Sequence, residues 1–304
     1  MSSAPAGQKN FAIVGVGGYI APRHIEAIKN LGHRLVAAVD TQDSVGILDR
    51  YFPDARFFTD FERFESFLEK GSPVDFVSIC SPNYLHASHI KAAFRLGANA
   101  ICEKPLVLTS LELDDLAAAE KRYDRKLFTV LQLRVHDAII ELKKKVEAEG
   151  RTSANPHQID LRYFTSRGNW YHESWKGETK KSGGLSTNIG VHFFDMLTWI
   201  FGAAKEATLT EKSASTEAGT LRLERANVHW LLSIDRAKLP PAAMAEGKTT
   251  FRSLKIDGFE FEFSEGFTEL HNRVYKDVLE GRGYGLEPAR AAIEIVEKLR
   301  GQHP

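Results

Sequence analysis

Residues Phe11 to Asp40 read FAIVGVGGYIAPRHIEAIKNLGHRLVAAVD, and this stretch decides the fold of the chain. The run from Phe11 to Val16 is short and apolar, which is typical of a buried parallel strand. Gly15, Gly17 and Gly18 lie at its end and allow a tight turn, in which backbone N–H groups approach an anion at the start of the next helix. The pattern predicts a strand–helix–strand unit whose first turn binds a pyrophosphate.

The rest of the stretch supports this interpretation except at one position. Pro22 suits the first turn of a helix, and Gly32 suits its C-terminal cap. Asp40 ends the second apolar run, close to the separation at which an acid accepts from the adenosine ribose, and its charge favours NAD over NADP. Ile20 stands where the third glycine of GxGxxG usually lies. A glycine turn without a ligand is therefore the alternative at this stage.

Composition narrows the class of protein. The 304 residues leave room for two domains, and Lys+Arg 40 balances Asp+Glu 40, so no global field favours nucleic acid or a membrane. Cys80 and Cys102 end apolar runs and form no disulfide framework, as in reduced cytoplasmic proteins. The leader MSSAPAGQKN lacks an apolar segment, and no later run approaches the length of a membrane span. We expect a soluble cytoplasmic protein with a short disordered leader.

Strand-like and helix-like segments alternate through the first half. This pattern predicts a doubly wound parallel sheet, a Rossmann domain over residues 1–133, with a ligand crevice at the carboxyl ends of the strands. The loops at that edge are GVGG, Asp40, SPNYLH, EKP and the Gln132 region. The expected later strands are 74–80, 98–102 and 127–133, and the expected later helices are 44–51, 60–70, one that ends near 96, and 109–123.

The second half, residues 134–304, has a different pattern. A charged helix over 135–149 leads to the loop RTSANP, interpreted as the linker. Six segments then read as strands, several of them half-exposed, which predicts an α+β domain with a large mixed or antiparallel sheet. A broad sheet with apolar outward positions commonly packs on its own copy, so we expect a homo-oligomer. The expected strands are 157–165, 206–212, 221–224, 227–235, 249–257 and 260–263, and a terminal helix, 286–300, can pack back on the first domain.

The tripeptide Glu103-Lys104-Pro105 follows a predicted strand at the ligand edge. A lysine placed there is partly desolvated and lies near the positive nicotinamide ring, and both effects lower its pKa and suit it to proton transfer. Pro105 stiffens the turn and is a candidate for a cis peptide bond. A plain surface turn is the alternative.

A second group of polar residues lies in SGGLSTNIGVHFFDMLTWIFG, Ser182 to Gly202. The segment predicts a helix that is apolar nearly all round and hence buried. Asn188, His192 and Asp195 nevertheless share one stripe of it, at i, i+4 and i+7. His192 is a candidate general base, and a structural hydrogen-bond network is the alternative.

The segment Thr165 to Lys181, TSRGNWYHESWKGETKK, combines cations with large aromatic side chains in a predicted long loop. Arg167 and Lys176 suit the phosphates of a uridine diphosphate sugar and the carboxylate of a uronic acid, while Trp170 and Tyr171 suit a sugar or base face. A solvated charged loop is the alternative.

These segments together resemble the Gfo/Idh/MocA oxidoreductase family. The resemblance covers essentially the whole chain and rests on GVGGYIAPRH, SICSPNYLH, ICEKPL and NIGVHFFD. With TSRGNWY and SWKG, the chain resembles members that oxidise the C3 hydroxyl of UDP-N-acetyl-D-glucosaminuronic acid with NAD, on the route to diacetamido uronic acids of surface polysaccharide (O-antigen). Such members are usually tetramers, and some reoxidise bound NADH with 2-oxoglutarate.

The resemblance also implies roles for particular residues. Lys104 and His192 are catalytic, and which of them accepts the proton stays open. Many relatives carry Asp where this chain has Asn188, and we interpret the amide as a donor to a uronate that a carboxylate would repel. The implied cofactor residues are Gly15, Gly17, Tyr19, Ile20, Asp40, Ser81, Asn83, His86, Glu103, Lys104 and Gln132. The implied substrate residues are Arg167, Asn169, Trp170, Tyr171, Lys176, Asn188 and His192, and no metal is implied.

Two other functions stay open from the sequence. A dehydrogenase of another sugar or of an inositol would share every Rossmann feature and differ in Thr165 to Lys181. A non-catalytic NAD-binding sensor is less compatible with the presence of both Lys104 and His192.

Overall fold

The computed structural model describes residues 7–71, 73–263 and 266–303, and the first six residues of the expected leader lie outside them. The chain forms two compact units. The first comprises Met1–Val107, Leu111–Val130 and Thr268–Pro288, and the second comprises Leu108–Ser110, Leu131–Phe267 and Ala289–Pro304. We predicted a boundary after residue 133, and in these units one segment ends at Val130 and the next begins at Leu131. The last part of the chain differs from expectation, because Thr268–Pro288 belongs to the first unit and most of the terminal helix belongs to the second.

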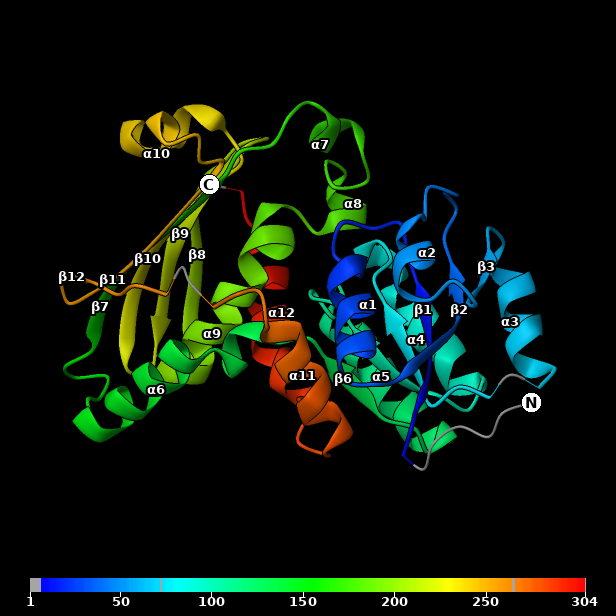
Figure 1. Ribbon diagram of the computed structural model, residues 1–304. Helices are drawn as coiled ribbons and strands as arrows, with labels where there is room; N and C mark the ends of the chain where they lie inside the picture. Colours follow the sequence, from blue (N-terminus) through cyan, green and yellow to red (C-terminus); the bar gives the residue numbers. More distant parts are fainter. Residues whose placement is uncertain (1–6, 72, 264–265, 304) are drawn as a thin grey trace. The chain divides into compact units, whose positions relative to one another are not determined.

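The first unit contains a six-stranded parallel sheet (Figure 1). Its order, β3-β2-β1-β4-β5-β6, is that of a Rossmann fold, which confirms the predicted doubly wound sheet. The last strand is shorter than predicted because Gln132–Val135 forms a 3₁₀ turn. The strands are β1 Asn10–Val14, β2 Arg34–Val39, β3 Arg56–Phe58, β4 Phe76–Ile79, β5 Asn99–Cys102 and β6 Leu127–Thr129.

Helices connect and flank these strands. Asp60 caps one of them, since its carboxylate accepts a hydrogen bond from the Arg63 N–H at 2.9 Å. The helix α11, Leu270–Leu279, was not predicted, and it packs against α1. The others are α1 Ala21–Asn30, α2 Ile47–Tyr51, α3 Phe61–Glu69, the 3₁₀ turn η1 Asn83–Leu85, α4 His86–Arg95 and α5 Ser110–Tyr123.

The second unit contains a mixed six-stranded sheet in the order β12-β11-β7-β10-β9-β8 (Figure 1). Only the β7–β10 pair among these is parallel, so the predicted mixed sheet is confirmed. The helix α9, Val191–Phe201, packs on one face, where Phe194 lies 5.4 Å from Trp230 between ring centroids. The strands are β7 His157–Thr165, β8 Ala204–Lys212, β9 Thr216–Leu223, β10 Ala226–Ser233, β11 Thr250–Ile256 and β12 Phe259–Glu260.

The other face of this sheet is largely polar. Its exposed central positions are Gln158 and Arg162 on β7, Arg222 on β9, His229 on β10 and Lys255 on β11. We expected apolar outward positions and inferred self-association from them. The half-buried Leu231 and Phe251 lie on this face among the polar residues, and self-association stays a prediction.

Short helices complete the second unit, two of them inside the segment predicted to be a loop. The terminal helix α12 is held there by Arg300, whose guanidinium donates to the Leu108 carbonyl at 2.7 Å. No helix among the described residues is long and apolar enough to cross a bilayer. The helices are η2 Gln132–Val135, α6 Asp137–Glu149, α7 Trp170–Glu173, α8 Thr179–Ser182, the π-helical η3 Ser186–Gly190, η4 Arg236–Lys238, α10 Pro241–Ala245 and α12 Glu287–Arg300.

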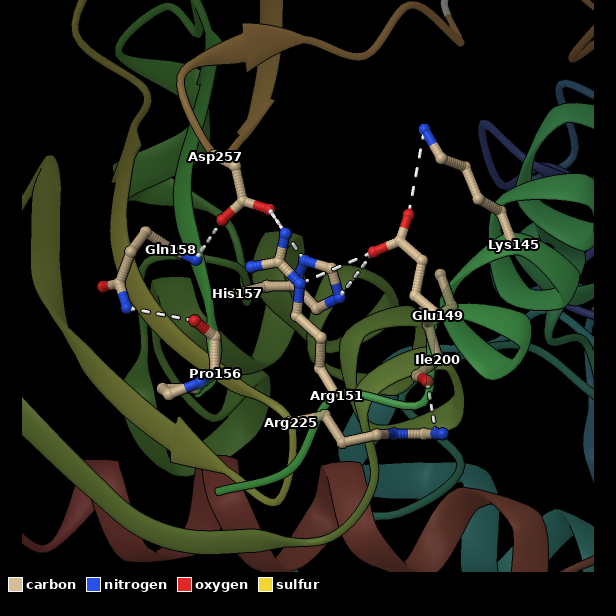
Figure 2. Close-up of polar contacts among 9 residues, drawn as sticks. All are labelled: Lys145, Glu149, Arg151, Pro156, His157, Gln158, Ile200, Arg225 and Asp257. Atoms are coloured by element: carbon tan, nitrogen blue, oxygen red, sulfur yellow. Dashed lines mark hydrogen bonds and ion pairs between the residues drawn. The ribbon is translucent and has the colours of Figure 1, made fainter. Parts of the chain in front are cut away.

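The loop RTSANP lies inside the second unit and is not the linker between units. An ion-pair cluster fixes its ends (Figure 2). His157 is buried, and its Nδ1 lies 2.9 Å from the carboxylate of Asp257. Arg151 lies 3.1 Å from the same carboxylate and 3.5 Å from that of Glu149. The cluster therefore ties the end of α6 and the start of β7 to the turn after β11.

Candidate active site

The glycine turn after β1 has little space for side chains. The Gly15 N–H donates to the Val39 carbonyl at 2.8 Å, and the Gly18 N–H donates to the Gly15 carbonyl at 3.0 Å. Gly15 has a φ of +83°, and a Cβ there would lie 2.7 Å from the backbone of Cys80. Only glycine fits this position, and the turn leads directly into α1, as a pyrophosphate cradle requires.

Asp40 follows β2 and faces this turn. Its carboxylate accepts hydrogen bonds from the N–H groups of Gly17 and Gln42, both at 2.9 Å. The acid is half-buried, and it is fixed beside the turn that would carry the phosphates. The arrangement fits the acid that accepts from the adenosine ribose in dinucleotide sites.

The two residues that break the glycine pattern have simple local conformations. Ile20 precedes α1 with φ −89° and ψ −21°, so its backbone does not need a glycine. Tyr19 is 94% exposed, and its ring contributes nothing to the core of the unit. Both therefore lie at the turn without disturbing it.

Three predicted cofactor residues follow β4 and are buried: Ser81, Asn83 and His86. The Ser81 hydroxyl bonds His89 Nδ1 at 2.8 Å. The ring nitrogens of His86 lie 2.8 Å from the carbonyls of Ser81 and Pro105, and a neutral imidazole donates to one of these at a time. Burial lowers the pKa of His86, although the backbone hydrogen bonds oppose the shift. His86 thus braces the loop after β4 against the loop after β5, instead of presenting a polar atom to solvent.

The Glu103-Lys104-Pro105 turn follows β5. The Lys104–Pro105 peptide bond is cis, as predicted. Glu103 is 6% exposed, and its Oε1 accepts from Nε2 of both His24 and His271 at 3.0 Å, while its Oε2 accepts from the Lys104 N–H at 3.1 Å. Burial would raise the pKa of the Glu103 carboxyl, but the hydrogen bonds from the two histidines outweigh it and hold the pKa well below its ordinary value. Glu103 is therefore a carboxylate engaged inside the unit.

The ligand-type atoms of His24, Glu103 and His271 all lie within 4.8 Å of one another. This grouping was not predicted. It could hold a metal ion by residue type, since two imidazoles and a carboxylate are common zinc ligands.

Gln132, the remaining cofactor residue implied by the resemblance, begins η2 and belongs to the second unit. All other predicted cofactor residues belong to the first unit.

The predicted substrate residues lie in the second unit, and two of them are bonded to each other. Tyr171 is 2% exposed, and its hydroxyl accepts a hydrogen bond from Asn188 Nδ2 at 2.8 Å. Burial raises the pKa of Tyr171, against an opposing effect of this hydrogen bond. Tyr171 is thus a neutral, buried anchor for Asn188 and not an exposed aromatic face.

Other members of the substrate set remain at the surface of the unit. Arg167, Asn169 and Trp170 are exposed. The Lys176 ammonium lies 4.4 Å from the ring centroid of Trp175 and 5.7 Å from that of Trp170, so the cation is held over two indoles. Cation–aromatic contacts therefore order this segment.

His192 lies in the first turn of α9, directly after the π-helical turn Ser186–Gly190. Its ring lies 4.2 Å from that of Phe193 and 5.9 Å from that of Tyr163, between centroids. The buried Glu217 accepts from the Ser186 N–H at 2.8 Å and fixes the start of the π-helical turn. Such turns are frequent at functional sites.

Asp195, the third residue of the predicted stripe, is part of an ion pair inside the unit. Its carboxylate is paired with the buried Arg134 through two hydrogen bonds of 2.7 and 3.0 Å. The stripe thus contributes this ion pair at Asp195 and the hydrogen bond to Tyr171 at Asn188.

The sequence interpretation missed several polar residues near the predicted ones, namely His24, Ser78, Arg134, Glu217, His271 and Tyr275. One signal was available, because His271 and Tyr275 are spaced i, i+4 on α11 and so share a helix face.

The chain matches the oxidoreductase family with an NAD-binding Rossmann fold over residues 9–131, and the C-terminal alpha/beta domain of the same family over residues 154–239. The chain belongs to the Gfo/Idh/MocA oxidoreductase family. This confirms the predicted resemblance, and the Rossmann unit of this Gfo/Idh/MocA protein is an NAD-binding domain.

Two solved structures of this family resemble the chain over nearly its full length. The WlbA (WbpB) dehydrogenase from Thermus thermophilus in complex with NAD and alpha-ketoglutarate is 47% identical, with 97% of this chain and 96% of that chain covered and a TM-score of 0.93. The WlbA (WbpB) dehydrogenase of the same organism in complex with NAD and UDP-GlcNAcA is 46% identical, with the same coverage and a TM-score of 0.92.

Curated relatives in the family are more distant. The putative oxidoreductase YteT from Bacillus subtilis is 23% identical over 53% of this chain. Myo-inositol 2-dehydrogenase from Thermotoga maritima is 29% identical over 46% of this chain. The chain spans only 38% and 40% of the lengths of these two relatives.

Proposed function

We propose that this protein oxidises the C3 hydroxyl of UDP-N-acetyl-D-glucosaminuronic acid (UDP-GlcNAcA) to the 3-keto sugar with NAD. The observation that carries the proposal is the whole-chain likeness to a WlbA (WbpB) dehydrogenase solved with NAD and UDP-GlcNAcA, at 46% identity and a TM-score of 0.92. The choice of C3 rests on the family resemblance of the motifs at Glu103–Pro105 and Asn188–His192.

The residues of the first unit fit NAD. The turn at Gly15 excludes side chains, the N-terminus of α1 follows it, and Asp40 is fixed beside Gly17. These groups would bind the pyrophosphate and the adenosine ribose. NAD, when bound, supplies a nicotinamide ring that accepts a hydride.

Residues of the protein itself carry out the proton transfer. Lys104 or His192 accepts the proton of the C3 hydroxyl, so that the C–H bond can release its hydride. Arg167 neutralises a substrate anion, and Asn188 donates to the uronate carboxylate. Tyr171 supports this role, because it holds the Asn188 amide in a fixed orientation.

A second substrate, 2-oxoglutarate, is part of the proposal. The support is the Thermus thermophilus structure solved with NAD and alpha-ketoglutarate, the same compound. Reduction of its ketone to 2-hydroxyglutarate would take up the hydride and regenerate NAD without its release. The enzyme would then turn over with only catalytic amounts of NAD.

The wider setting follows from the family resemblance alone. We infer that the protein acts in the cytoplasm, as a homotetramer, in the supply of diacetamido uronic acids for surface polysaccharide (O-antigen). Light scattering coupled to size-exclusion chromatography tests the tetramer, and a monomer at working concentration would contradict it.

A substrate panel tests the proposed function. The purified protein is incubated with NAD and with UDP-GlcNAcA, UDP-GlcNAc, free sugars and inositols, and NADH absorbance is followed with and without 2-oxoglutarate. We expect NADH only with UDP-GlcNAcA, and 2-hydroxyglutarate when 2-oxoglutarate is present. Turnover of an inositol or a free sugar, with UDP-GlcNAcA inert, would replace the proposal by the corresponding dehydrogenase, and NAD binding without any turnover would favour a sensor.

A further inference from the structure

We propose that a buried hydrogen-bond chain formed by Ser78, Tyr275, His24 and His271 positions Lys104, and that it acts through the Glu103 carboxylate. These are positioning residues and not catalytic ones. The proposal rests on the proposed function only insofar as Lys104 acts on the substrate.

The hydrogen bonds from Ser78 to Glu103 are continuous and buried. Ser78 Oγ lies 2.6 Å from the Tyr275 hydroxyl, and that hydroxyl lies 2.7 Å from His24 Nδ1. His24 Nε2 lies 3.0 Å from Glu103 Oε1. Ser78, Tyr275 and His24 are all fully buried. Water therefore cannot replace any of these contacts without a change in the packing.

The direction of each hydrogen bond in this network follows from the Glu103 carboxylate at its end. A carboxylate only accepts, so His24 must carry its proton on Nε2. Burial lowers the pKa of His24, so the ring is neutral and its Nδ1 accepts from Tyr275. The Tyr275 hydroxyl has then used its only proton, and Ser78 must donate to it. The network thus fixes one tautomer of His24.

Glu103 gathers two further donors. His271 Nε2 lies 3.0 Å from the oxygen that His24 also contacts, and the Lys104 N–H donates to the other oxygen at 3.1 Å. The rings of His24 and His271 meet edge to face at 4.9 Å between centroids. The carboxylate therefore links two imidazoles to the backbone of Lys104.

These residues come from distant parts of the chain. His24 lies on α1, Ser78 on β4 and Glu103 after β5, whereas His271 and Tyr275 lie on α11. On its other side, Lys104 is followed by the cis peptide bond to Pro105, whose carbonyl contacts His86 at 2.8 Å. The turn is thus held from both sides, and α11 contributes directly to one of them.

A positioning role explains why polar residues occupy this core. Apolar side chains of similar volume often stabilise a core at least as well as a buried charge with its partners. Precise placement of a reacting group is a different requirement, since a displacement of about 1 Å can cost about 100-fold in rate. A network whose every donor and acceptor is satisfied is rigid and supplies that precision.

A metal ion is the competing interpretation of the same three side chains, and it requires the opposite tautomer. A metal between His24, His271 and Glu103 would take the Nε2 lone pairs, so His24 would carry its proton on Nδ1 and donate to Tyr275. Nitrogen-15 NMR of the histidine-labelled full chain distinguishes the tautomers. The proposal predicts Nε2–H at His24 and no stoichiometric metal by elemental analysis, and Nδ1–H with one bound metal would overturn it.

Substitutions test the positioning role. Tyr275→Phe removes only the hydroxyl, and Tyr51→Phe is the matched control because its hydroxyl donates to Glu26 on the surface of the same unit. His271→Leu removes a donor to Glu103, and His271→Gln restores one. Each variant is first checked for NAD affinity and thermal midpoint, so that turnover is compared among folded, NAD-binding molecules.

We expect turnover with UDP-GlcNAcA to fall about tenfold in Tyr275→Phe and up to about 100-fold in His271→Leu. His271→Gln should stay within about threefold of wild type, as should Tyr51→Phe, and the KM for NAD should change less than turnover in every variant. Wild-type turnover in both Tyr275→Phe and His271→Leu would overturn the proposal, as would equal losses in His271→Gln and His271→Leu.

A readout without substrate separates this proposal from the proposed function. The rate of acylation of Lys104 by a small anhydride is measured by peptide mass spectrometry. It reports how accessible the Lys104 amino group is and how readily it loses its proton. We expect this rate to change at least threefold in His271→Leu, to change less in Tyr275→Phe, and to return to the wild-type value in His271→Gln. Unchanged labelling in all three variants would contradict the proposal, even if the wild-type enzyme oxidised a different sugar.

Discussion

Asn188 Nδ2 donates a hydrogen bond of 2.8 Å to the hydroxyl of Tyr171, and this contact fixes the amide that we propose binds the uronate. Tyr171 is buried, and it lies in the segment that the sequence marked as substrate-binding. An amide held in this way can donate to a carboxylate, whereas a carboxylate at the same position would repel one.

Asn188→Asp should therefore weaken binding of the uronate. We expect the KM for UDP-GlcNAcA to rise about tenfold, because two like charges would approach each other, while the dissociation constant of UDP-GlcNAc, which lacks the carboxylate, changes little. Steady-state kinetics with UDP-GlcNAcA and a calorimetric titration with UDP-GlcNAc check this. Tyr171→Phe, which removes the hydrogen bond and adds no charge, should raise both constants by a similar, smaller factor. An unchanged KM and rate with UDP-GlcNAcA in Asn188→Asp would contradict this role of Asn188.

Lys104→Ala and His192→Ala should separate chemistry from cofactor binding. Loss of a positioned acid or base costs about 100- to 10,000-fold in turnover, so each variant should lose that much while NAD affinity survives. Turnover against pH in Lys104→Ala and His192→Asn identifies the proton acceptor, since its loss removes the acid limb of the profile. Wild-type rates in both alanine variants would remove the assignment.

The glycines of the first turn should respond differently to alanine. Gly15→Ala forces a φ of +83° on a side-chain residue and drives its Cβ to 2.7 Å from backbone atoms, so we expect a loss of about 2 kcal/mol or more in stability. The nearest atoms to the Cβ of Gly17→Ala would be those of the Asp40 carboxylate, at 3.3 Å and beyond. That variant should keep its stability and bind NAD more weakly. Urea unfolding and calorimetric NAD titration measure the two effects, and equal stability losses would refute the distinction.

His89 should make the fold sensitive to acid. Burial, with a smaller effect of His86, lowers the pKa of His89 to about 4 from 6.5. Between these pH values, His89 is therefore protonated in the unfolded chain and neutral in the folded chain. The stabilisation is complete above about pH 6.5 and is lost as the pH falls towards about 4, by up to about 3 kcal/mol.

His89→Asn keeps a polar atom near the Ser81 hydroxyl and cannot be protonated in this range. Between about pH 7 and about pH 5, the unfolding free energy from urea titration should fall by about 2 kcal/mol less in the variant than in wild type. The same pH dependence in both proteins would show that His89 is accessible to protons in the folded state.

Local patterns predicted most of the fold. Alternating strands and helices predicted the doubly wound parallel sheet, and β7 appeared at its predicted bounds, His157–Thr165, because its apolar positions alternate clearly. The helix α11 was not predicted, because a short amphipathic segment after a run of strands carries little local signal. Its assignment to the first unit depends on contacts with α1, which no local pattern contains.

The sequence predicted the local motifs of the site but not the long-range partners of its residues. The turn at Gly15 and the acid at Asp40 are local features with a fixed spacing, and both lie as predicted relative to each other. Long-range partners were not predictable in this way: Glu103 and His271 are 168 positions apart, yet they share a hydrogen bond. Ile20 was an apparent defect only because the motif assumes a glycine where this backbone has an ordinary helical conformation.

Transfer of deuterium from C3 of the sugar tests the central claim most directly. UDP-GlcNAcA deuterated at C3 is incubated with the enzyme and NAD without 2-oxoglutarate, the reaction is quenched, and the extracted cofactor and sugar are analysed by mass spectrometry and NMR. We predict deuterium in the reduced cofactor and a ketone at C3 of the sugar. Reduced cofactor without deuterium, or a sugar that keeps its label, would contradict the account.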